Sequence, residues 1–327
     1  MENALKILFY ILIFPGGIFT IAISLLLAGI DRKLVARMQL RQGPPLLQPL
    51  FDTFKLFGKE VIVPKNANRK TFLLAPIVGL VCILIIPIFI PVFTKIFSSA
   101  SADVIVIIYL LTIPAVALVI GGSSSASFFG GIGSSREVVT MIAYELPMVM
   151  SILSVCKKAG EVMGVGTVYS MAGLELFQIT KGIAILNPAL IPAAIAFLMV
   201  IPAEVGVVPF DMAEAETEIC EGPLAEYSGI YLSLYKLTSN IKAYVMSGLF
   251  VALFLGGRGL QIFEIDWINI VINIILFILL VFIVMFISVT LVRSICGRLK
   301  INQGLKFYWT VPSLLSVISL ILVFIGV

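Results

Sequence analysis

The chain has 327 residues, of which 60% are hydrophobic and 12% are charged, and its formal net charge at pH 7 is +4. Its mean hydropathy of +1.15 excludes an ordinary soluble domain. There is no histidine, which excludes bis-histidine haem ligation, and the four cysteines are isolated, without the CxxC spacing of a cluster site. We therefore predict an integral membrane protein with no redox centre, metal or cofactor of its own. Isolated cysteines are most often buried small hydrophobes, and we expect the same of Cys82, Cys156, Cys220 and Cys296.

Eight segments are apolar and long enough to cross a bilayer, which takes about 20 mostly apolar residues. The first is too long for a signal-peptide core and lacks a small-residue cleavage site, so we expect a retained span. The glycine- and serine-rich stretch 121–135 is expected to be a flexible loop. The sequence predicts an all-α polytopic membrane protein, with residues 1–327 forming one membrane domain. The approximate spans are 7–30, 72–93, 104–122, 138–156, 183–208, 227–256, 268–292 and 309–327.

The distribution of lysine and arginine predicts the orientation, because short loops rich in these residues stay cytoplasmic. The loops after the first, third, fifth and seventh spans hold 14 of them, against 6 in the N-terminal segment and the other loops. We therefore expect a multi-pass protein of the cytoplasmic membrane with both termini on the outer side.

The cytoplasmic loop 209–226, here called the acidic loop, carries six carboxylates and no basic residue. Asp211 and Glu214 have capping-box spacing, and Gly222 is followed by Pro223, a helix stop signal. This pattern predicts a short helix with four carboxylates on one face, where like charges repel and cations are needed. Those four are Asp211, Glu214, Glu218 and Glu221, and the remaining two acids are Glu216 and Glu226.

Candidate cations lie in the first cytoplasmic loop, 31–71, here called the basic loop. Lys33, Arg37 and Arg41 are four residues apart, and the stretch 46–60 places apolar residues among further lysines. One interpretation is an amphipathic helix at the membrane interface, with its basic residues near anionic lipid. We prefer a second, in which the basic and acidic loops pack together as a platform for a soluble partner. The docking residues would be Arg32, Lys33, Arg37, Arg41, Lys55 and Lys59.

Four ionisable residues lie inside predicted spans, namely Glu145, Glu204, Lys236 and Lys242. Each costs roughly 2.5–3.5 kcal/mol at membrane depth, so each suggests a function. The four could pair only to hold helices together. The alternative that we favour is a hydrated path of protonatable groups, in which neighbouring charge shifts proton occupancy. The predicted ion or proton pathway consists of Glu145, Glu204, Asp211, Glu214, Glu216, Glu218, Glu221, Glu226, Lys236 and Lys242.

Several motifs together carry a family resemblance. They are DRKLVARMQLRQGPP (31–45), DTFKLFGKE (52–60), AYE (143–145), and AE (203–204) followed by PFDMAEAETEICEGPLAEYSG (209–229). In this order they resemble the signature series of the membrane subunit that joins the peripheral and membrane arms of respiratory complex I and its relatives. The resemblance covers most of the chain and implies eight spans.

Two details resemble the energy-converting nickel-iron hydrogenase branch, namely the short turn GPPLLQP (43–49) and the form GPLAEYSG (222–229). Quinone-reducing members usually have an arginine and a glutamate where this chain has Val207 and Ser239. The resemblance therefore implies a membrane-anchor and coupling subunit that links ferredoxin-dependent hydrogenase chemistry to H⁺ or Na⁺ translocation, without a catalytic centre of its own.

The same resemblance matches Glu145 and Glu204 to the family's glutamates in spans 4 and 5, and the six acids to its acidic loop. It implies hydrogenase-like large and small subunits, an iron–sulfur subunit and antiporter-like membrane subunits as partners, with ferredoxin as electron donor and no nucleic acid. Iron–sulfur clusters and a nickel-iron site would lie in those partners. The alternatives are the equivalent subunit of a complex that reduces quinone, methanophenazine or a sulfur compound, and a standalone secondary transporter.

Overall fold

The computed structural model describes residues 12–90, 103–256 and 266–326, and within these ranges the regular elements are all helices. Six described helices are long and apolar enough to cross a membrane, and one more apolar helix is shorter. The predicted all-α polytopic class is thereby confirmed. The first predicted span lies partly outside the described residues.

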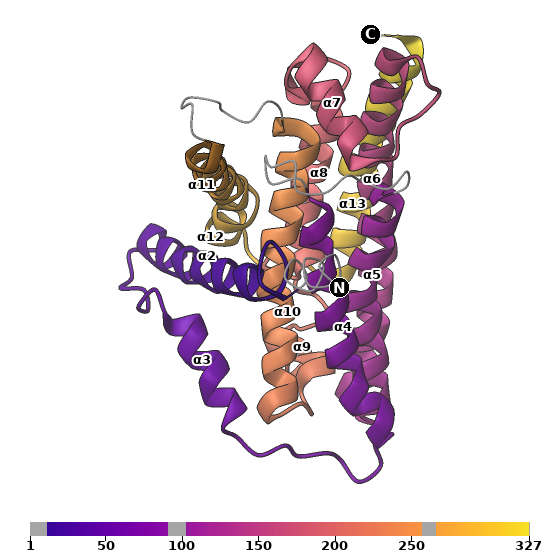
Figure 1. The fold of residues 1–327 in the computed structure, drawn as a ribbon. Coiled ribbons are helices and arrows are strands. Elements are labelled where there is room, and N and C mark those ends of the chain that lie inside the picture. The colour runs from indigo at the N-terminus through magenta and orange to yellow at the C-terminus, as the bar shows by residue number, and fades with distance from the viewer. Residues whose placement is uncertain (1–11, 91–102, 257–265, 327) are drawn as a thin grey trace.

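Most of the long helices run side by side along one direction (Figure 1). They are α4 (Arg69–Phe89), α5 (Asp103–Ser124), α6 (Phe128–Met163), α10 (Gly229–Phe250) and α13 (Ile301–Ile325). The short α8 (Ile191–Val205) packs among α6, α10 and α13, and its last six residues, 200–205, are all buried. α11 (Asp266–Met285) continues through the π-helix η4 (Phe286–Thr290) into α12 (Leu291–Ile295), and α10 continues into the π-helix η3 (Val251–Leu255).

α2 (Gly17–Met38) lies across the direction of the other long helices (Figure 1). It continues eight residues past the predicted span end at residue 30, so the first part of the basic loop is helical. The rest of that loop contains α3 (Gln48–Phe57), which lies beside α2 and α10. The basic loop is therefore two helices with a short connection.

α6 extends well beyond the predicted span 138–156 at both ends. The stretch 121–135 is mostly helical, so the prediction of a flexible loop there is wrong. Its glycines allow close packing against the 3₁₀ turn η2 (Gly222–Leu224): a Cβ at Gly133 would stand 2.4 Å from Cδ of Pro223. The glycines thus serve helix packing, and they place the start of α6 against the acidic loop.

The acidic loop contains only a one-turn helix, α9 (Glu216–Ile219), followed by η2. The predicted short helix with four carboxylates on one face is therefore wrong. Cys220 and Glu221 adopt positive φ angles of 49° and 66°, which a right-handed helix cannot include. The chain reverses there, so the four acids do not lie on one face of a helix.

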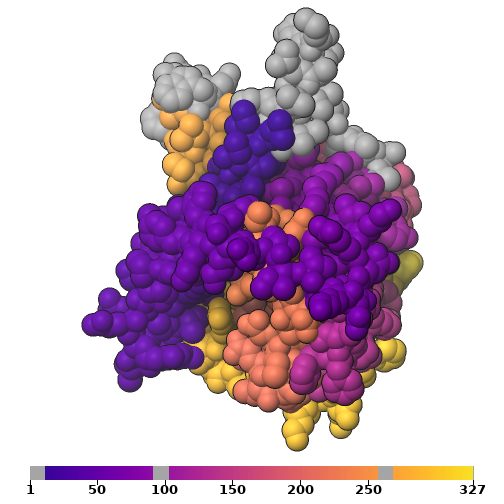
Figure 2. All heavy atoms as spheres, turned by 90° about the horizontal axis from the view of Figure 1, so that it is seen from below, coloured from indigo at the N-terminus to yellow at the C-terminus, as the bar shows by residue number. Residues whose placement is uncertain are grey.

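Four segments far apart in the sequence meet at one end of the molecule, here called the loop end: the connections before α4, between α5 and α6, between α8 and α10, and before α13. The Asn68 amide donates to the Ser124 carbonyl and the Leu299 amide to the Pro209 carbonyl, each at 3.0 Å. Figure 2 shows this end from below, with basic-loop residues in violet beside orange residues of the acidic loop and α10. α7 (Met171–Lys181) and the end of α13 lie at the opposite end (Figure 1). The alternation of the described helices agrees with the predicted topology.

The cysteines divide between the interior and the surface. Cys156 is buried and Cys82 is partly buried, whereas Cys220 and Cys296 are exposed. The expectation of burial is wrong for the latter two, because both lie in loop-end connections and not on a packed helix face.

Candidate functional site

The centre of the site is a buried ion pair between two helices. Lys242 Nζ of α10 lies 2.8 Å from Glu204 Oε1 of α8, and their side chains are only 8% and 2% exposed. Gly206, at φ +72°, ends α8 two residues after Glu204 and turns the chain into the acidic loop. The structure therefore brings together two of the four predicted intramembrane charges, next to the acidic loop.

The other two intramembrane charges lie apart from this pair. Lys236, expected at interior depth, is exposed, because it faces the opening of a cavity nearer the loop end. Glu145 of α6 is partly exposed between the exposed Ile142 and Leu146, and it forms no hydrogen bond or ion pair with the described residues. It is still close enough to interact electrostatically with Glu204 and Lys242.

A small cavity of about 60 Å³ separates the ion pair from the acidic loop. Its walls come from α5, α6, α8, α10 and the acidic loop, and four carboxylates and one ammonium group line it. These are Glu137, Glu204, Asp211, Glu214 and Lys242. Sequence reasoning missed Glu137, because the predicted span begins at residue 138 and leaves this residue in a loop. Recognising that the glycine-rich stretch is helical would have placed it on the same helix as Glu145.

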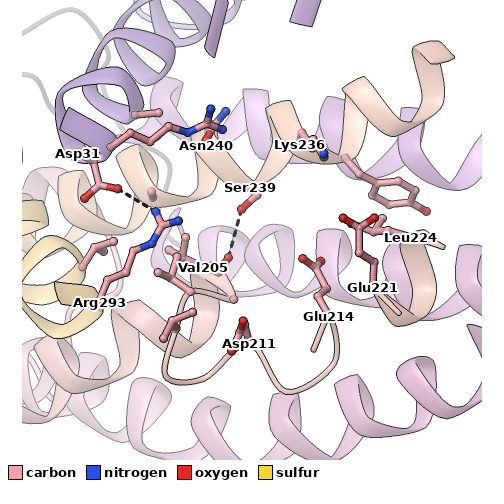
Figure 3. Close-up of a pocket in the computed structure, with 18 of the residues that line it drawn as sticks. Asp31, Val205, Asp211, Glu214, Glu221, Leu224, Lys236, Ser239, Asn240 and Arg293 are labelled. Atoms are coloured by element: carbon pink, nitrogen blue, oxygen red, sulfur yellow. Dashed lines mark hydrogen bonds and ion pairs between the residues drawn. The ribbon is translucent and has the colours of Figure 1, made fainter. Parts of the chain in front are cut away.

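A larger cavity of about 320 Å³ lies on the loop-end side (Figure 3). Asp211, Glu214 and Glu221 project into it from the acidic loop, across from Lys236 on α10 (Figure 3). Asp211 and Glu214 also line the small cavity, so the two cavities are adjacent. Polar side chains therefore extend from the loop end to the buried ion pair. The charged residues lining the large cavity are Asp31, Arg32, Asp211, Glu214, Glu216, Glu221, Lys236, Arg293 and Arg298.

Burial and neighbouring carboxylates perturb Glu214. Desolvation, followed by the charges of Glu137, Asp211 and Glu221, raises the pKa of Glu214 to about 8, against a lowering by Lys242. Glu214 therefore holds a proton at neutral pH much more readily than an exposed glutamate.

Two arginines hold the acidic loop, and neither comes from the basic loop. Arg298, just before α13, donates from Nε to both carboxylate oxygens of Asp211, at 2.9 and 3.1 Å, and from Nη1 to the Thr217 hydroxyl at 3.1 Å. Arg136 of α6 pairs with Glu218. The prediction that basic-loop cations neutralise the acidic loop is therefore wrong, because nearer arginines of other segments take those positions.

The basic-loop cations face elsewhere. Arg32 lines the large cavity, but its ion pair is with Asp52 of α3, at 2.9 Å. Arg32, Lys55 and Lys59 line a separate groove between α3 and α10. The apolar surface of α3 is also exposed. The basic residues exposed at the surface are Arg37, Arg41, Lys55 and Lys59, and Lys33 is partly exposed. Partner docking and lipid binding by these residues both stay predictions.

A second buried carboxylate was also missed by sequence reasoning. Asp31 of α2 is 5% exposed, and it accepts hydrogen bonds from the Thr290 hydroxyl at 2.7 Å and from Arg293 at 3.2 Å. This cluster joins α2 to the π-helix η4 at one wall of the large cavity (Figure 3). Its sequence signal is the DRK motif, which the predicted span boundary leaves in a loop.

The last acids of the predicted pathway, Glu216 and Glu226, are exposed, and Glu221 is partly exposed. In the described ranges, no group of three or more histidine, cysteine, aspartate or glutamate residues is arranged to hold a metal ion. The charged side chains around the two cavities are carboxylates, lysines and arginines.

Comparisons with known proteins agree with this architecture. The family model described as NADH dehydrogenase matches residues 9–324. The chain is 30% identical to one of the NADH-quinone oxidoreductase subunits of Dehalococcoides mccartyi, over 97% of this chain and 85% of the relative. It is 33% identical to hydrogenase-4 component C of Escherichia coli, over 75% of this chain and 76% of the relative.

A solved structure of the membrane-bound sulfane sulfur reductase, an archaeal respiratory membrane complex, contains a similar chain. The TM-score is 0.85 at 27% identity, covering 98% of this chain and 99% of the other. The chain described here therefore belongs to the NADH dehydrogenase family, as a membrane subunit of the complex I type.

Proposed function

We propose that this chain is the membrane-anchor and coupling subunit of a redox-driven ion pump in the cytoplasmic membrane. The observation that carries the proposal is the juxtaposition of the acidic loop with the buried Glu204–Lys242 pair, separated only by a small polar cavity. Because the acidic loop adjoins this pair, a change of charge in the loop can alter the proton affinity of Glu204 inside the membrane.

The mechanism is electrostatic. Redox chemistry in a peripheral module changes charge or protonation at the acidic loop, and this changes the proton affinity of Glu204, with Lys242 as its countercharge. Glu145, within electrostatic reach but on the surface of this chain, passes the change outward to neighbouring membrane subunits. Lys236 acts from the large cavity, where it faces acidic-loop carboxylates (Figure 3).

We assign the complex to the hydrogenase branch. Val207 and Ser239, at the positions where quinone-reducing members usually have arginine and glutamate, both line the large cavity, and Ser239 donates to the Val205 carbonyl at 3.2 Å. The similarity to hydrogenase-4 component C supports the same branch. The partners would be hydrogenase-like large and small subunits, an iron–sulfur subunit and antiporter-like subunits, with clusters and a nickel-iron site in those partners and ferredoxin as donor.

The second candidate is the equivalent subunit of a sulfur-reducing complex, which the similarity to the sulfane sulfur reductase chain favours. Affinity purification through this chain, followed by assays with reduced ferredoxin, separates the two. Hydrogen evolution and four nickel-ligating cysteines in the large partner are expected for the hydrogenase. Sulfide evolution from a polysulfide without hydrogen would reject it. Ion transport by this chain alone in vesicles would instead favour a standalone transporter.

The coupling role is tested by Glu204→Gln in the intact complex, with Glu161→Gln, an exposed carboxylate near the other end of α6, as matched control. We expect Glu204→Gln to lower ion translocation per electron by about a hundredfold, the low end of what a positioned proton-transfer group contributes. Inside-out vesicles with a pH-sensitive dye or radioactive sodium provide the measurement. Normal turnover together with normal translocation would remove the coupling role.

The anchoring role is tested by reversing charge on α3. Lys55→Glu combined with Lys59→Glu is expected to release the peripheral module at lower salt than in the wild type, because exposed ion pairs are screened by salt. Lys181→Glu, at the opposite end of the molecule, is the control. If the double variant retained the module up to the same salt concentration as the wild type, α3 would not be its docking site. The lipid-binding interpretation of α3 would then stand.

A further inference from the structure

Glu137 occupies a position in the small cavity that the proposed pathway does not yet use. It lies near the start of α6, eight residues before Glu145, and it shares the cavity wall with Glu204 of α8 and Glu214 of the acidic loop. Three segments thus contribute carboxylates to the same space, the acidic loop with Asp211 as well as Glu214, and α10 contributes Lys242.

The charges of this group do not balance. Lys242 pairs with Glu204, and Asp211, which also lines the cavity, is neutralised by Arg298. The side chains of Glu137 and Glu214 form no ion pair with the described residues. Because neighbouring carboxylates disfavour each other's ionised form, the group retains protons near neutral pH. The charge of Glu137 is, after burial, the largest cause that raises the pKa of Glu214.

The volume and the polar lining of the small cavity allow water in this region. Glu204 Oε1 is buried and accepts no well-aligned hydrogen bond, although Lys242 Nζ is 2.8 Å away. The hydroxyl of Tyr144, a residue 1% exposed, lies within hydrogen-bonding reach of the Glu204 carboxylate. A buried water needs about 10–15 Å³ and several polar partners. The cavity of about 60 Å³ therefore has both the room and the groups for more than one water.

We propose that Glu137 carries the proton between the acidic loop and the buried ion pair. A proton leaves the Glu214 carboxyl through water for the Glu137 carboxylate, and then leaves Glu137 for the Glu204 carboxylate. Each step moves one proton and changes no oxidation state. The inference rests on the proposed coupling function and adds to it the entry residue on α6, the helix that also carries Glu145.

If Glu137 had only a structural role, Glu137→Gln would act by removing a contact. Its side chain forms no hydrogen bond or ion pair with the described residues, so the isosteric Glu137→Gln removes no such contact. Glu161 provides a matched control on the same helix, near its other end, where it pairs with Lys158 at 3.5 Å. Glu161→Gln changes one carboxylate of α6 that lies outside the small cavity.

The test compares Glu137→Gln, Glu137→Asp, Glu161→Gln and Glu204→Gln in the assembled complex in inside-out vesicles, with complex content measured on native gels. We expect Glu137→Gln to assemble normally and to lower ion translocation per electron by about a hundredfold. Glu137→Asp, which keeps a titratable group, should recover most of this loss, and Glu161→Gln should match the wild type. Redox-induced infrared difference spectra should lose a carboxylic-acid C=O band in Glu137→Gln.

Several results would overturn the inference. Wild-type translocation in Glu137→Gln would do so, and so would failed assembly of that variant, since failure would reveal a structural contact. If Glu204→Gln is impaired while Glu137→Gln is not, the coupling function stands and only the role of Glu137 is lost. If both variants translocate normally, the coupling function itself is rejected.

Discussion

Burying the Glu204–Lys242 pair costs free energy. Removing two charges from water costs several kcal/mol per ion, and buried pairs of this type often stabilise a fold no better than well-packed apolar residues. Both side chains are almost fully buried in a chain that has abundant apolar residues elsewhere. Helix association alone therefore does not explain the buried pair. Proton transfer does explain it, because that role needs a protonatable group next to the polar cavity.

Glu214 gives the protein a pH-dependent stability that can be measured. Its pKa is raised from 4.5 to about 8 in the folded chain, so between these values the folded state binds more protons than the unfolded state. Stability therefore falls as pH rises through this window and is constant above it. Glu214→Gln, which is neutral at every pH, should be increasingly more stable than the wild type as pH rises from 4.5 to about 8.

Thermal melting of the purified complex across this pH range provides the measurement. Glu226→Gln, a change in an exposed carboxylate of the same loop, should follow the wild type at every pH. Parallel melting curves for Glu214→Gln and the wild type would mean that Glu214 is ionised and solvated at neutral pH.

At the scale of elements, the apolar helices were predictable and the acidic loop was not. Uninterrupted hydrophobicity located α4, α5 and α10 to within a few residues of their predicted ends. α6 was predicted too short, because its first turns are glycine- and serine-rich, and the glycines serve close packing against Pro223. The capping-box pattern at Asp211 predicts a hydrogen bond within the next turn of chain. The carboxylate of Asp211 instead binds Arg298, which is 87 residues away in the sequence.

The same arginine provides a test of what holds the acidic loop. Arg298→Ala removes the charge-assisted hydrogen bonds to Asp211 and the hydrogen bond to Thr217, and hydrogen bonds to charged groups contribute about 1.5–3 kcal/mol. We expect faster amide hydrogen exchange over 209–221 and weaker coupling, with the membrane helices unchanged. Arg298→Lys should recover only part of the protection, since a lysine cannot form the bidentate contact.

Arg37→Ala is the matched control for this experiment, because Arg37 is an exposed arginine of the basic loop without an ion pair to the described residues. If Arg37→Ala loosened the acidic loop as much as Arg298→Ala, the basic loop would be its true partner after all.

For the whole molecule, the sequence predicted which connections share one end. The contacts of Asn68 with Ser124 and of Leu299 with Pro209 join connections that the topology had placed together. Which end faces the cytoplasm depends on the positive-inside rule alone, since no contact within one chain distinguishes the two sides of a membrane. Partner identity is likewise outside what one chain contains, because the exposed cations of α3 suit lipid and protein equally well.

The natural cysteines test the orientation directly. Cys220 and Cys296 are exposed at the loop end, whereas Cys156 is buried, so a membrane-impermeant maleimide has two natural targets on one side. After the peripheral module is stripped, both should react in inside-out vesicles and stay unreacted in right-side-out vesicles or cells. Lys181→Cys, at the end of α7 on the opposite side, should show the reverse pattern. Labelling of Cys220 from outside would invert the topology and place the acidic loop away from any cytoplasmic redox module.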